Sequence, residues 1–286
     1  MSANQKQHST WGMVQYRIRK NPVAIASVIF IVVLCLVAVL APYLATHDPN
    51  KQNLRNTFAG MSSENWFGTD DLGRDTYSRI IWGARISVII GVSSVALGGI
   101  VGVCLGLVSG YFGGWIDTVV MRFIDMMLAF PGVLLAILII SILGPGLFNL
   151  IAAISVWSIP LFARIIRSSV LSIKEELYIE AARSVGAGTL RILFNHVLIN
   201  SMAPIIVYGT LRVATAILTA AALSFLGLGV QPPTAEWGAM IDRGRVYLRR
   251  SPIMVVFPGL AILVTTLAVN LLGDALRDAL DPVLNE

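Results

Sequence analysis

The stretch Ile86–Ser109 reads ISVIIGVSSVALGGIVGVCLGLVS and contains no charged side chain. As a helix it extends about 36 Å, which exceeds the roughly 30 Å hydrocarbon core of a bilayer. Gly98, Gly102, Gly106 and Gly110 recur at every fourth position and therefore share one face of that helix. Because glycine has no side chain, we expect a second helix to approach this face closely. The stretch predicts a membrane-spanning helix within a helical bundle.

The composition of the whole chain also indicates a membrane protein. Of its 286 residues, 56% are hydrophobic and 13% are charged, against about 25% charged in a typical soluble domain. This composition excludes a soluble globule and predicts contact with the lipid bilayer. The basic residues are scattered and form no single stripe, so we expect no nucleic-acid partner. Cys35 and Cys104 lie in separate apolar runs and predict neither a disulfide framework nor a metal site.

Five further apolar runs are long enough to cross the bilayer, so the expected fold class is an all-α membrane protein with six transmembrane helices. The first run follows Arg17, Arg19 and Lys20 and is longer than the apolar region of a signal peptide, which predicts a retained anchor. A Gly-Pro-Gly turn at 144–146 predicts a hairpin between the third and fourth helices. The runs cover about 23–44, 119–143, 148–166, 205–228 and 255–272.

An even number of spans places both termini on one side of the membrane. Slightly more lysines and arginines fall on this side than on the other, so we expect the N- and C-termini in the cytoplasm. The expected organisation has three parts. They are a cytoplasmic tail, first helix and outer segment over 1–83, a core of five helices over 84–275, and a cytoplasmic tail over 276–286.

The sequence lacks the common motifs of catalysis and nucleotide binding. No Gly-x-x-x-x-Gly-Lys-[Ser/Thr] loop occurs, so the chain itself is expected to hydrolyse no ATP. The three histidines lack metal-ligand spacing, and no Gly-x-Ser-x-Gly motif is present. We therefore predict no catalytic residue, no metal site and no cofactor held by this chain.

The polar segment 172–200 is a long connector that nonetheless carries helix signals. Ser172 with Glu175 fits a capping box, Gly186 fits a helix stop, and Thr189 fits the cap of a second helix. Two interpretations are open: a helix pair that lies on the lipid headgroups, or a docking element for a soluble partner. The apolar faces expected for the two helices consist of Leu177, Tyr178, Ala181, Ala182 and Val185, then Leu190, Leu193, Phe194, Val197 and Leu198.

This segment contains Glu180-Ala181-Ala182, Gly186, Arg191-Ile192 and His196-Val197-Leu198. In this order the residues resemble the EAA loop of importer permeases of the ATP-binding-cassette (ABC) superfamily. Ile199 departs from the pattern, because proline is common there. The resemblance implies a type I ABC importer permease fold whose EAA loop forms coupling helices in a cleft of the ATPase subunit. The coupling residues that it implies are Glu180, Ala181, Ala182, Arg183 and Gly186.

Further motifs follow one another over nearly the whole chain from Trp66 onward. They are Phe67-Gly68-Thr69-Asp70, Gly73-Arg74-Asp75, Ser78-Arg79, Met121 to Asp125, Ala129-Phe130-Pro131, Ser224 to Gly229, Gln231-Pro232-Pro233, Glu236-Trp237-Gly238 and Asn270 to Pro282. These motifs resemble the dipeptide, oligopeptide, glutathione and nickel group of permeases, specifically its C-type subunit. Ala235 is a minor departure, since proline is frequent there.

The resemblance implies a set of partners and a location. They are a second, different permease subunit, two ATP-binding subunits that hold ATP and magnesium, an extracytoplasmic solute-binding protein, and the bacterial inner membrane. The implied cargo is a di- or oligopeptide, with glutathione, a nickel complex or another small solute as alternatives. The alternative of another class is a self-sufficient channel or ion-coupled transporter. Asp125 is its one clear intramembrane acid, and no internal repeat is evident.

Charged residues in or beside the apolar runs have competing interpretations. Arg122 and Asp125, three residues apart on one helix, are expected to neutralise each other, with a place in the solute path as the alternative. Arg212 is expected to snorkel to the interface, with contact to a peptide carboxylate as the alternative. A charged turn is expected either to be solvated or to contact the solute-binding protein. It contains Asp70, Asp71, Arg74, Asp75 and Arg79.

Overall fold

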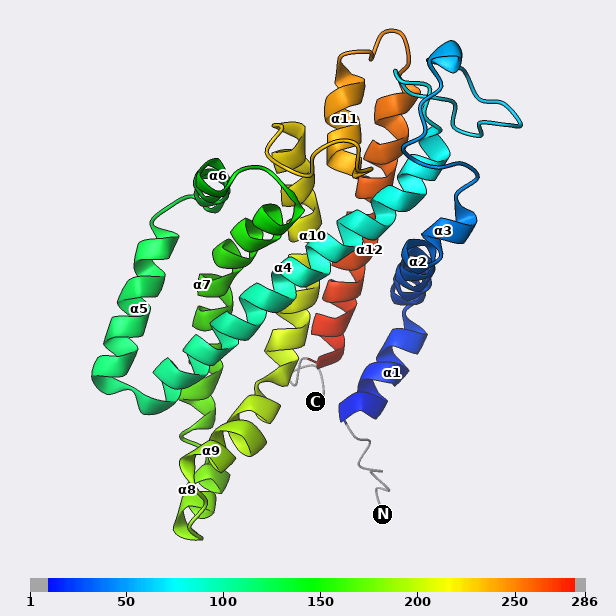
Figure 1. Ribbon diagram of the computed structural model, residues 1–286. Helices are drawn as coiled ribbons and strands as arrows, with labels where there is room; N and C mark the ends of the chain where they lie inside the picture. Colours follow the sequence, from blue (N-terminus) through cyan, green and yellow to red (C-terminus); the bar gives the residue numbers. More distant parts are fainter. Residues whose placement is uncertain (1–9, 281–286) are drawn as a thin grey trace, which may run out of the picture.

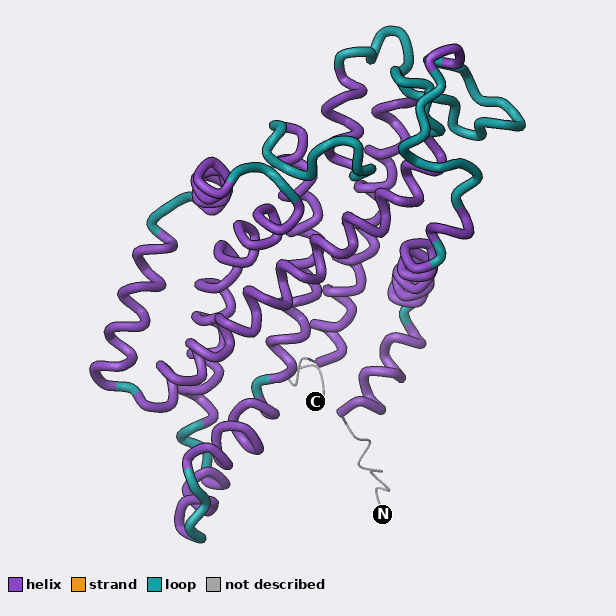
Figure 2. Tube along the Cα trace, in the orientation of Figure 1, coloured by secondary structure: helices purple, strands orange, loops and turns teal. Residues whose placement is uncertain are grey.

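The computed structural model describes residues 10–280, and every named element in this range is helical. Long helices run side by side through the molecule, and loops gather at its ends (Figures 1 and 2). The elements are α1 (Thr10–Lys20), α2 (Pro22–Val39), α3 (Ala41–Leu44), η1 (Leu54–Asn56), α4 (Thr76–Phe112), α5 (Gly114–Leu128), α6 (Gly132–Leu143), α7 (Leu147–Ile173), α8 (Leu177–Ser184), α9 (Thr189–Ile192), the π-helical turn η2 (Leu193–Leu198), α10 (Met202–Phe225), α11 (Trp237–Arg245) and α12 (Ile253–Leu280).

Five helices are individually long and apolar enough to cross a membrane: α2, α4, α7, α10 and α12. The third predicted span is not one straight helix, because α5 and α6 meet at an angle of 86°. The break falls at 129–131, where Pro131 disfavours the helical conformation of the residue before it. Counting this bent pair as one span gives the six that were expected.

The elements outside the long helices separate into two groups at opposite ends of the bundle (Figure 1). The pair α8 and α9 projects from one end, called here the α8 end, and α1 and the last turns of α12 lie toward it. The segment 45–75 and α11 cover the other end, called here the α11 end. The connector 174–200 thus lies at the end opposite to these two segments (Figure 1).

Side chains at the helix starts explain where two of the spans begin. Asn21 Oδ1 accepts hydrogen bonds from the backbone N–H groups of Val23 and Ala24, beside Pro22 at the first position of α2. Asp75 Oδ2 accepts a hydrogen bond from Ser78 N at 2.8 Å. This cap starts α4 at Thr76, ten residues before the apolar run, so α4 extends beyond the hydrocarbon at the α11 end.

The glycine face of α4 packs directly on the backbone of α7. A Cβ atom built at Gly98, Gly102 or Gly106 would lie 2.5 to 2.6 Å from a carbonyl oxygen of α7. Real Cβ atoms do not approach so closely, so only glycine permits this contact. The oxygens belong to Ser155, Ile159 and Ala163, which are themselves four residues apart. The predicted close approach of a second helix is confirmed, and that helix is α7.

The matched variants Gly102→Ala and Gly99→Ala test this packing. Both add one methyl group to α4 and gain the same helix propensity, about 1 kcal/mol. The new Cβ would lie 2.5 Å from Ile159 O at position 102, but at an ordinary 3.5 Å from Phe162 at position 99. We expect Gly102→Ala to be less stable than Gly99→Ala by about 1–3 kcal/mol. The apparent melting temperature of the purified protein in detergent measures this, and equal values for the two variants would contradict the close contact.

Candidate functional site

The segment 174–200 forms a helical hairpin that begins differently from its prediction. The helix α7 continues to Ile173, and α8 starts at Leu177 after Glu176, whose side chain makes no capping bond. Ser172 lies inside α7 and donates to Ser168 O at 3.5 Å. The predicted capping box of Ser172 and Glu175 is therefore wrong, because the preceding helix continues past Ser172.

Gly186 ends α8, as the sequence predicted. Its φ is +82°, in the left-handed region that glycine adopts without steric cost. Gly186 N donates to Arg183 O at 2.9 Å, and Ala187 N donates to Ala182 O at 3.0 Å. These two bonds make a Schellman motif. Thr189 is the first residue of α9 and Gly188 occupies the cap, so the predicted cap is displaced by one residue.

The hairpin is anchored through a small apolar cluster at the α8 end. Ile179, Ile192 and Val197 are at most 1% exposed and belong to one cluster with Ile166 and Val170 of α7. Burying these side chains fixes the hairpin relative to α7 and α4. Ile179 was absent from the predicted apolar face, so α8 presents a different side to the bundle than its pattern suggested.

Of the predicted apolar side chains, Leu193 and Val197 are buried as expected, but four others point outward. Leu177 is 80% exposed, Val185 85%, Leu190 70% and Phe194 57%. These four residues are called the hairpin tip here. The predicted coupling residues Glu180, Ala181, Arg183 and Gly186 are also exposed, and Ala182 is half-buried. An exposed apolar group of this kind on a projecting, anchored hairpin is typical of a docking surface.

Two contacts connect the hairpin to the end of α4. The guanidinium of Arg183 lies 5.5 Å from the ring centroid of Tyr111, a cation–π distance. Lys174 Nζ donates to Gly110 O at 3.3 Å. Sequence reasoning missed Tyr111, because nothing local distinguishes it from other aromatic residues near a span end.

Two ion pairs within the spans join α5 to α7, and neither lies along one helix. Arg164 of α7 donates to Asp125 of α5 at 2.6 Å. The predicted pair of Arg122 with Asp125 is therefore wrong, because packing of α5 beside α7 offers Asp125 a better partner. Nearer the α8 end, Arg167 donates to both carboxylate oxygens of Asp117 at 2.6 Å.

Arg212 does not snorkel, contrary to the prediction. Its side chain is buried, with the residue only 7% exposed. Its Nη2 donates to Ser158 Oγ at 3.2 Å, and its guanidinium lies 4.8 Å from the ring centroid of Trp157. The aromatic face supplies the stabilisation that water at the interface would have given.

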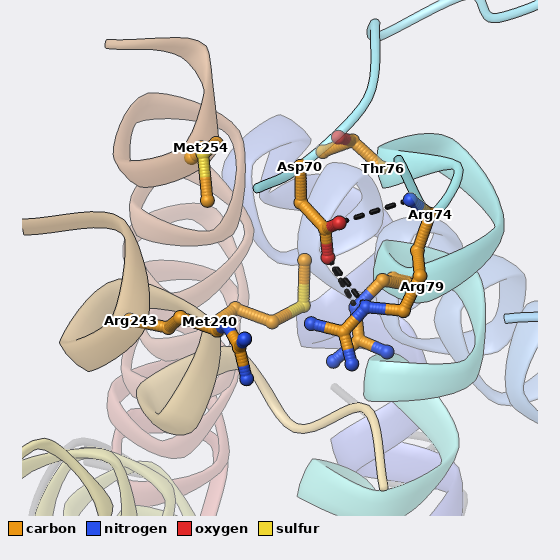
Figure 3. Close-up of a pocket in the computed structure, with 7 residues that line it drawn as sticks. All are labelled: Asp70, Arg74, Thr76, Arg79, Met240, Arg243 and Met254. Atoms are coloured by element: carbon orange, nitrogen blue, oxygen red, sulfur yellow. Dashed lines mark hydrogen bonds and ion pairs between the residues drawn. The ribbon is translucent and has the colours of Figure 1, made fainter. Parts of the chain in front are cut away.

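At the α11 end, segment 45–75 folds around the buried carboxylate of Asp70. Arg74 Nε donates to Asp70 Oδ2 at 2.7 Å, and Arg79 Nε lies 3.7 Å from the same oxygen. The other oxygen, Oδ1, accepts from the backbone N–H groups of Leu72 and Arg74, both at 2.9 Å. Figure 3 shows Asp70 with the guanidinium groups of Arg74, Arg79 and Arg243 around a cavity of about 20 Å³, room for about one water molecule.

A second ion pair connects this segment to α11. Arg243 Nε and Nη2 donate to the carboxylate of Asp71 at 2.8 Å, across 172 residues of sequence. These bonds stabilise the charged guanidinium and raise the pKa of Arg243 above its ordinary value. Arg79 adds hydrogen bonds to the backbone oxygens of Pro49 and Pro233, at 2.9 and 3.3 Å. We call segment 45–75 with α11 the cap.

The charged turn of the cap is neither solvated nor exposed for docking. Asp70, Arg74, Asp75 and Arg79 are 2 to 5% exposed. Asp75, besides capping α4, accepts a hydrogen bond from Asn65 Nδ2 at 2.9 Å. Both predictions for these side chains are wrong for one reason: the opposite charges neutralise one another closely enough to be buried together. Their role here is to hold the cap on the bundle.

Glu236 and Trp237 secure α11 from the other side. The Glu236 carboxylate accepts hydrogen bonds from Gly238 N and Ala239 N, both at 2.8 Å. Burial raises the pKa of Glu236, although these bonds favour the charged form. Trp237 Nε1 donates to Ile80 O of α4 at 3.0 Å. The sequence offered these residues only as part of a family resemblance, and the structure shows their local purpose.

Two family models match the sequence. One, described as "Binding-protein-dependent transport system inner membrane component", matches residues 102–286, and "N-terminal TM domain of oligopeptide transport permease C" matches residues 9–60. The chain belongs to this family of ABC importer permeases. It is therefore a multi-pass membrane protein that acts as a permease subunit within an ABC importer complex of permease and ATPase subunits.

Named relatives cover nearly the whole permease. The "Dipeptide transport system permease protein DppC" of Alkalihalophilus pseudofirmus is 47% identical over 274 residues, which are 96% of this chain and 90% of the relative. The "Glutathione transport system permease protein GsiD" of Pectobacterium atrosepticum is 46% identical over 275 residues, 96% and 91% of the two chains. The expected membership of the C-type peptide permease group is confirmed.

Two solved structures share the fold of the permease. The inward-facing methionine ABC transporter MetNI aligns with a TM-score of 0.56 at 17% identity, over 71% of this chain and 96% of that chain. An amino acid ABC transporter crystallised with histidines aligns with a TM-score of 0.54 at 18% identity, over 70% and 94%. At such identities the likeness concerns the fold alone, and it confirms the expected type I permease fold.

Replacing the carboxylate at the centre of the cap should destabilise it strongly. Asp70→Asn keeps the size of the side chain but leaves two buried guanidinium groups without the charge they share, at a cost of about 3–5 kcal/mol. Asp242→Asn is the control, because the ion pair of Asp242 with Arg245 is exposed. The side chains of Asp242 and Arg245 are 32% and 55% exposed, so the pair should contribute about 1 kcal/mol or less. Melting temperature and protease resistance of segment 45–75 measure the difference. A cap equally resistant in both variants would contradict this role for Asp70.

The end of α8 offers a second matched pair. An added Cβ meets no atom within 4 Å at Gly186 or at Gly188, but only Gly186 has a positive φ. Gly186→Ala should therefore cost about 1 kcal/mol or more through backbone strain, while Gly188→Ala should change stability little. Amide hydrogen exchange in α8 measures the effect. Equal exchange rates in the two variants would show that the left-handed stop does not hold the hairpin.

Proposed function

We propose that the permease is one of two transmembrane subunits of a bacterial inner-membrane importer for short peptides, with glutathione within the same solute class. Two relatives of nearly equal similarity support this, one named for dipeptides and one for glutathione. Both solutes are small peptides with free carboxylate groups. A second, different permease subunit completes the path in this proposal, and an extracytoplasmic solute-binding protein delivers the peptide.

The observation that carries the proposal is the hairpin. Its inner side is anchored by Ile179, Ile192 and Val197, while its apolar tip stands clear of the bundle. A soluble ATPase subunit that covers the tip would remove this apolar surface from water. Because the hairpin is anchored on α7 and α4, the ATPase subunit would then be connected to these two helices. In the proposed complex the ATPase subunits hold ATP and magnesium, and this chain holds neither.

The proposed mechanism transmits closure of the ATPase subunits through the hairpin. ATP favours their closed state, and the hairpin moves with them because its tip lies in their cleft. The contacts of Arg183 with Tyr111 and of Lys174 with Gly110 carry this movement to the end of α4. Since α4 and α7 are in backbone contact, they move as one body, and the path changes from inward-facing to outward-facing.

The same proposal orients the permease. The α8 end faces the cytoplasm, where ATP is available, and the α11 end faces outward. There the solute-binding protein meets exposed side chains of the connection between α11 and α12, not the buried Asp70 cluster. Val246 and Leu248, 75% and 50% exposed, and the exposed Arg249 and Arg250 form this surface.

Reversing one exposed charge on α8 tests the docking of the hairpin. Glu180→Lys changes the charge at a contact with the ATPase cleft and should cost about 2–5 kcal/mol of docking, lowering solute-stimulated ATP hydrolysis by tenfold or more. Glu180→Gln, which only removes the charge, should lose less. The reconstituted complex in liposomes, with loaded solute-binding protein, provides the measurement.

The competing interpretation of the hairpin gives the opposite result. On anionic headgroups an added lysine is favourable by about 1 kcal/mol. Undiminished stimulation in Glu180→Lys would therefore make the hairpin a membrane-surface element and remove the basis of the proposed coupling.

A further inference from the structure

The ion pair of Asp125 and Arg164 lies within the membrane-spanning parts of α5 and α7. Asp125 is eleven residues from the start of α5 at Gly114, and Arg164 is nine residues from the end of α7 at Ile173. At 1.5 Å per residue, Asp125 lies about 9 Å inside the apolar run that begins near 119, and Arg164 lies about 3 Å inside the run that ends near 166. Both charges therefore lie within the apolar part of their spans.

Both side chains are nevertheless open to their surroundings. The Arg164 side chain is 54% exposed and that of Asp125 is 49% exposed. The pair holds the guanidinium at 2.6 Å from Asp125, so Arg164 does not reach toward the headgroups. Exposure of two charges to lipid at this depth is strongly unfavourable, and charged residues in membrane proteins face protein or a water-filled cavity. The face of α5 and α7 that carries the pair therefore does not face lipid.

The charge on this face is not balanced. Arg122 lies one turn from Asp125 on α5, is exposed, and makes no ion pair with any residue in the described range 10–280. Trp157 lies seven residues before Arg164, hence on the same face of α7. The guanidinium of Arg212 lies over the ring of Trp157, and the buried Nε of Arg212 has no hydrogen-bond partner among the described residues. Positive charge thus exceeds negative charge, and an anionic group would be stabilised here.

We propose that Arg164 and Asp125 form a solute site in the translocation path, where Arg164 exchanges Asp125 for the carboxylate of a passing peptide. This inference rests on the proposed function. Arg164 suits the exchange because its planar guanidinium binds one carboxylate as well as another. When no solute is present, Asp125 neutralises the guanidinium, which avoids the free-energy cost of an unpaired charge in the path. Asp125 also competes with the solute for Arg164, and this competition favours release of the solute.

The pair Asp117–Arg167 serves as a matched control. It joins the same two helices by the same kinds of residue, one turn nearer the α8 end on α7 and about two turns nearer on α5. Its side chains are 18% and 32% exposed, and two hydrogen bonds of 2.6 Å hold them together. It is therefore a structural brace with less access to a solute.

Import kinetics of the complete complex in liposomes, with alanyl-alanine and glutathione as probes, test the site. Arg164→Gln should raise the KM for the imported probe about tenfold or more, as expected for loss of a charge-assisted hydrogen bond. Arg164→Lys should recover part of this loss. Asp125→Asn should lower KM, because the competitor for Arg164 is gone. The double variant Asp117→Asn with Arg167→Gln should leave KM within about twofold, with assembly of the complex checked for every variant.

The opposite signs at Arg164 and Asp125 distinguish a solute site from a brace. If both variants change KM in the same direction, or neither does, the pair is structural and the inference is overturned. If the wild-type complex imports the probes and responds to Glu180→Lys as proposed, only this inference fails. If the wild-type complex imports neither probe, the proposed solute class fails as well.

Thiol labelling tests the site without any import. Asp125→Cys, in a chain with Cys35→Ala and Cys104→Ala, should react with a charged, water-soluble methanethiosulfonate in the assembled complex. Saturating alanyl-alanine should slow this reaction about fivefold or more by occupying the site. A cysteine that stays unlabelled, or that alanyl-alanine does not protect, would show that lipid or a partner subunit covers this face.

Discussion

The contact between the backbones of α4 and α7 is the constraint on which the rest of the permease depends. In a bilayer the hydrophobic effect does not drive helices together, because lipid tails are as apolar as leucine side chains. Close van der Waals contact must replace it, and Gly98, Gly102 and Gly106 supply that contact by leaving nothing between the two helices. Together α4 and α7 form one rigid unit. One end of α4 carries Asp75 within the cap and the other carries Tyr111 against the hairpin.

The sequence predicted best those features that depend on local composition. Hydropathy located all six spans, and the four-residue spacing of the glycines identified the packing face of α4. Errors arose where the decisive partner came from another helix. Arg122 and Asp125 have ideal spacing along α5, yet Asp125 pairs with Arg164 of α7. Arg212 stays buried because its guanidinium contacts the ring of Trp157 and donates a hydrogen bond to Ser158. No pattern along one helix contains such information.

The hairpin shows a more general limit of reading amphipathic patterns. The pattern of Leu177, Ala181 and Val185 indicates an apolar face, and the usual assumption is that such a face is buried in its own chain. Here the chain buries Ile179 instead and leaves Leu177 and Val185 outside. A subunit of a larger complex buries apolar side chains in two places: in its own core and at its interfaces with partner subunits. The periodicity of the sequence reveals an apolar face, but not whether this face is buried in the core of the subunit or at an interface.

The buried ion cluster of the cap has a consequence for biosynthesis. Asp71 and Arg243 are 172 residues apart, and α4, the bent pair, α7 and α10 are all synthesised between them. At about 5–20 residues per second, Asp71 leaves the ribosome roughly ten to thirty seconds before Arg243. During that interval Asp71, beside the α11 end of α4, has no Arg243 with which to pair. The cap therefore closes late, because Asp71 can pair with Arg243 only after α10 has crossed the membrane and brought α11 to the same end of the bundle.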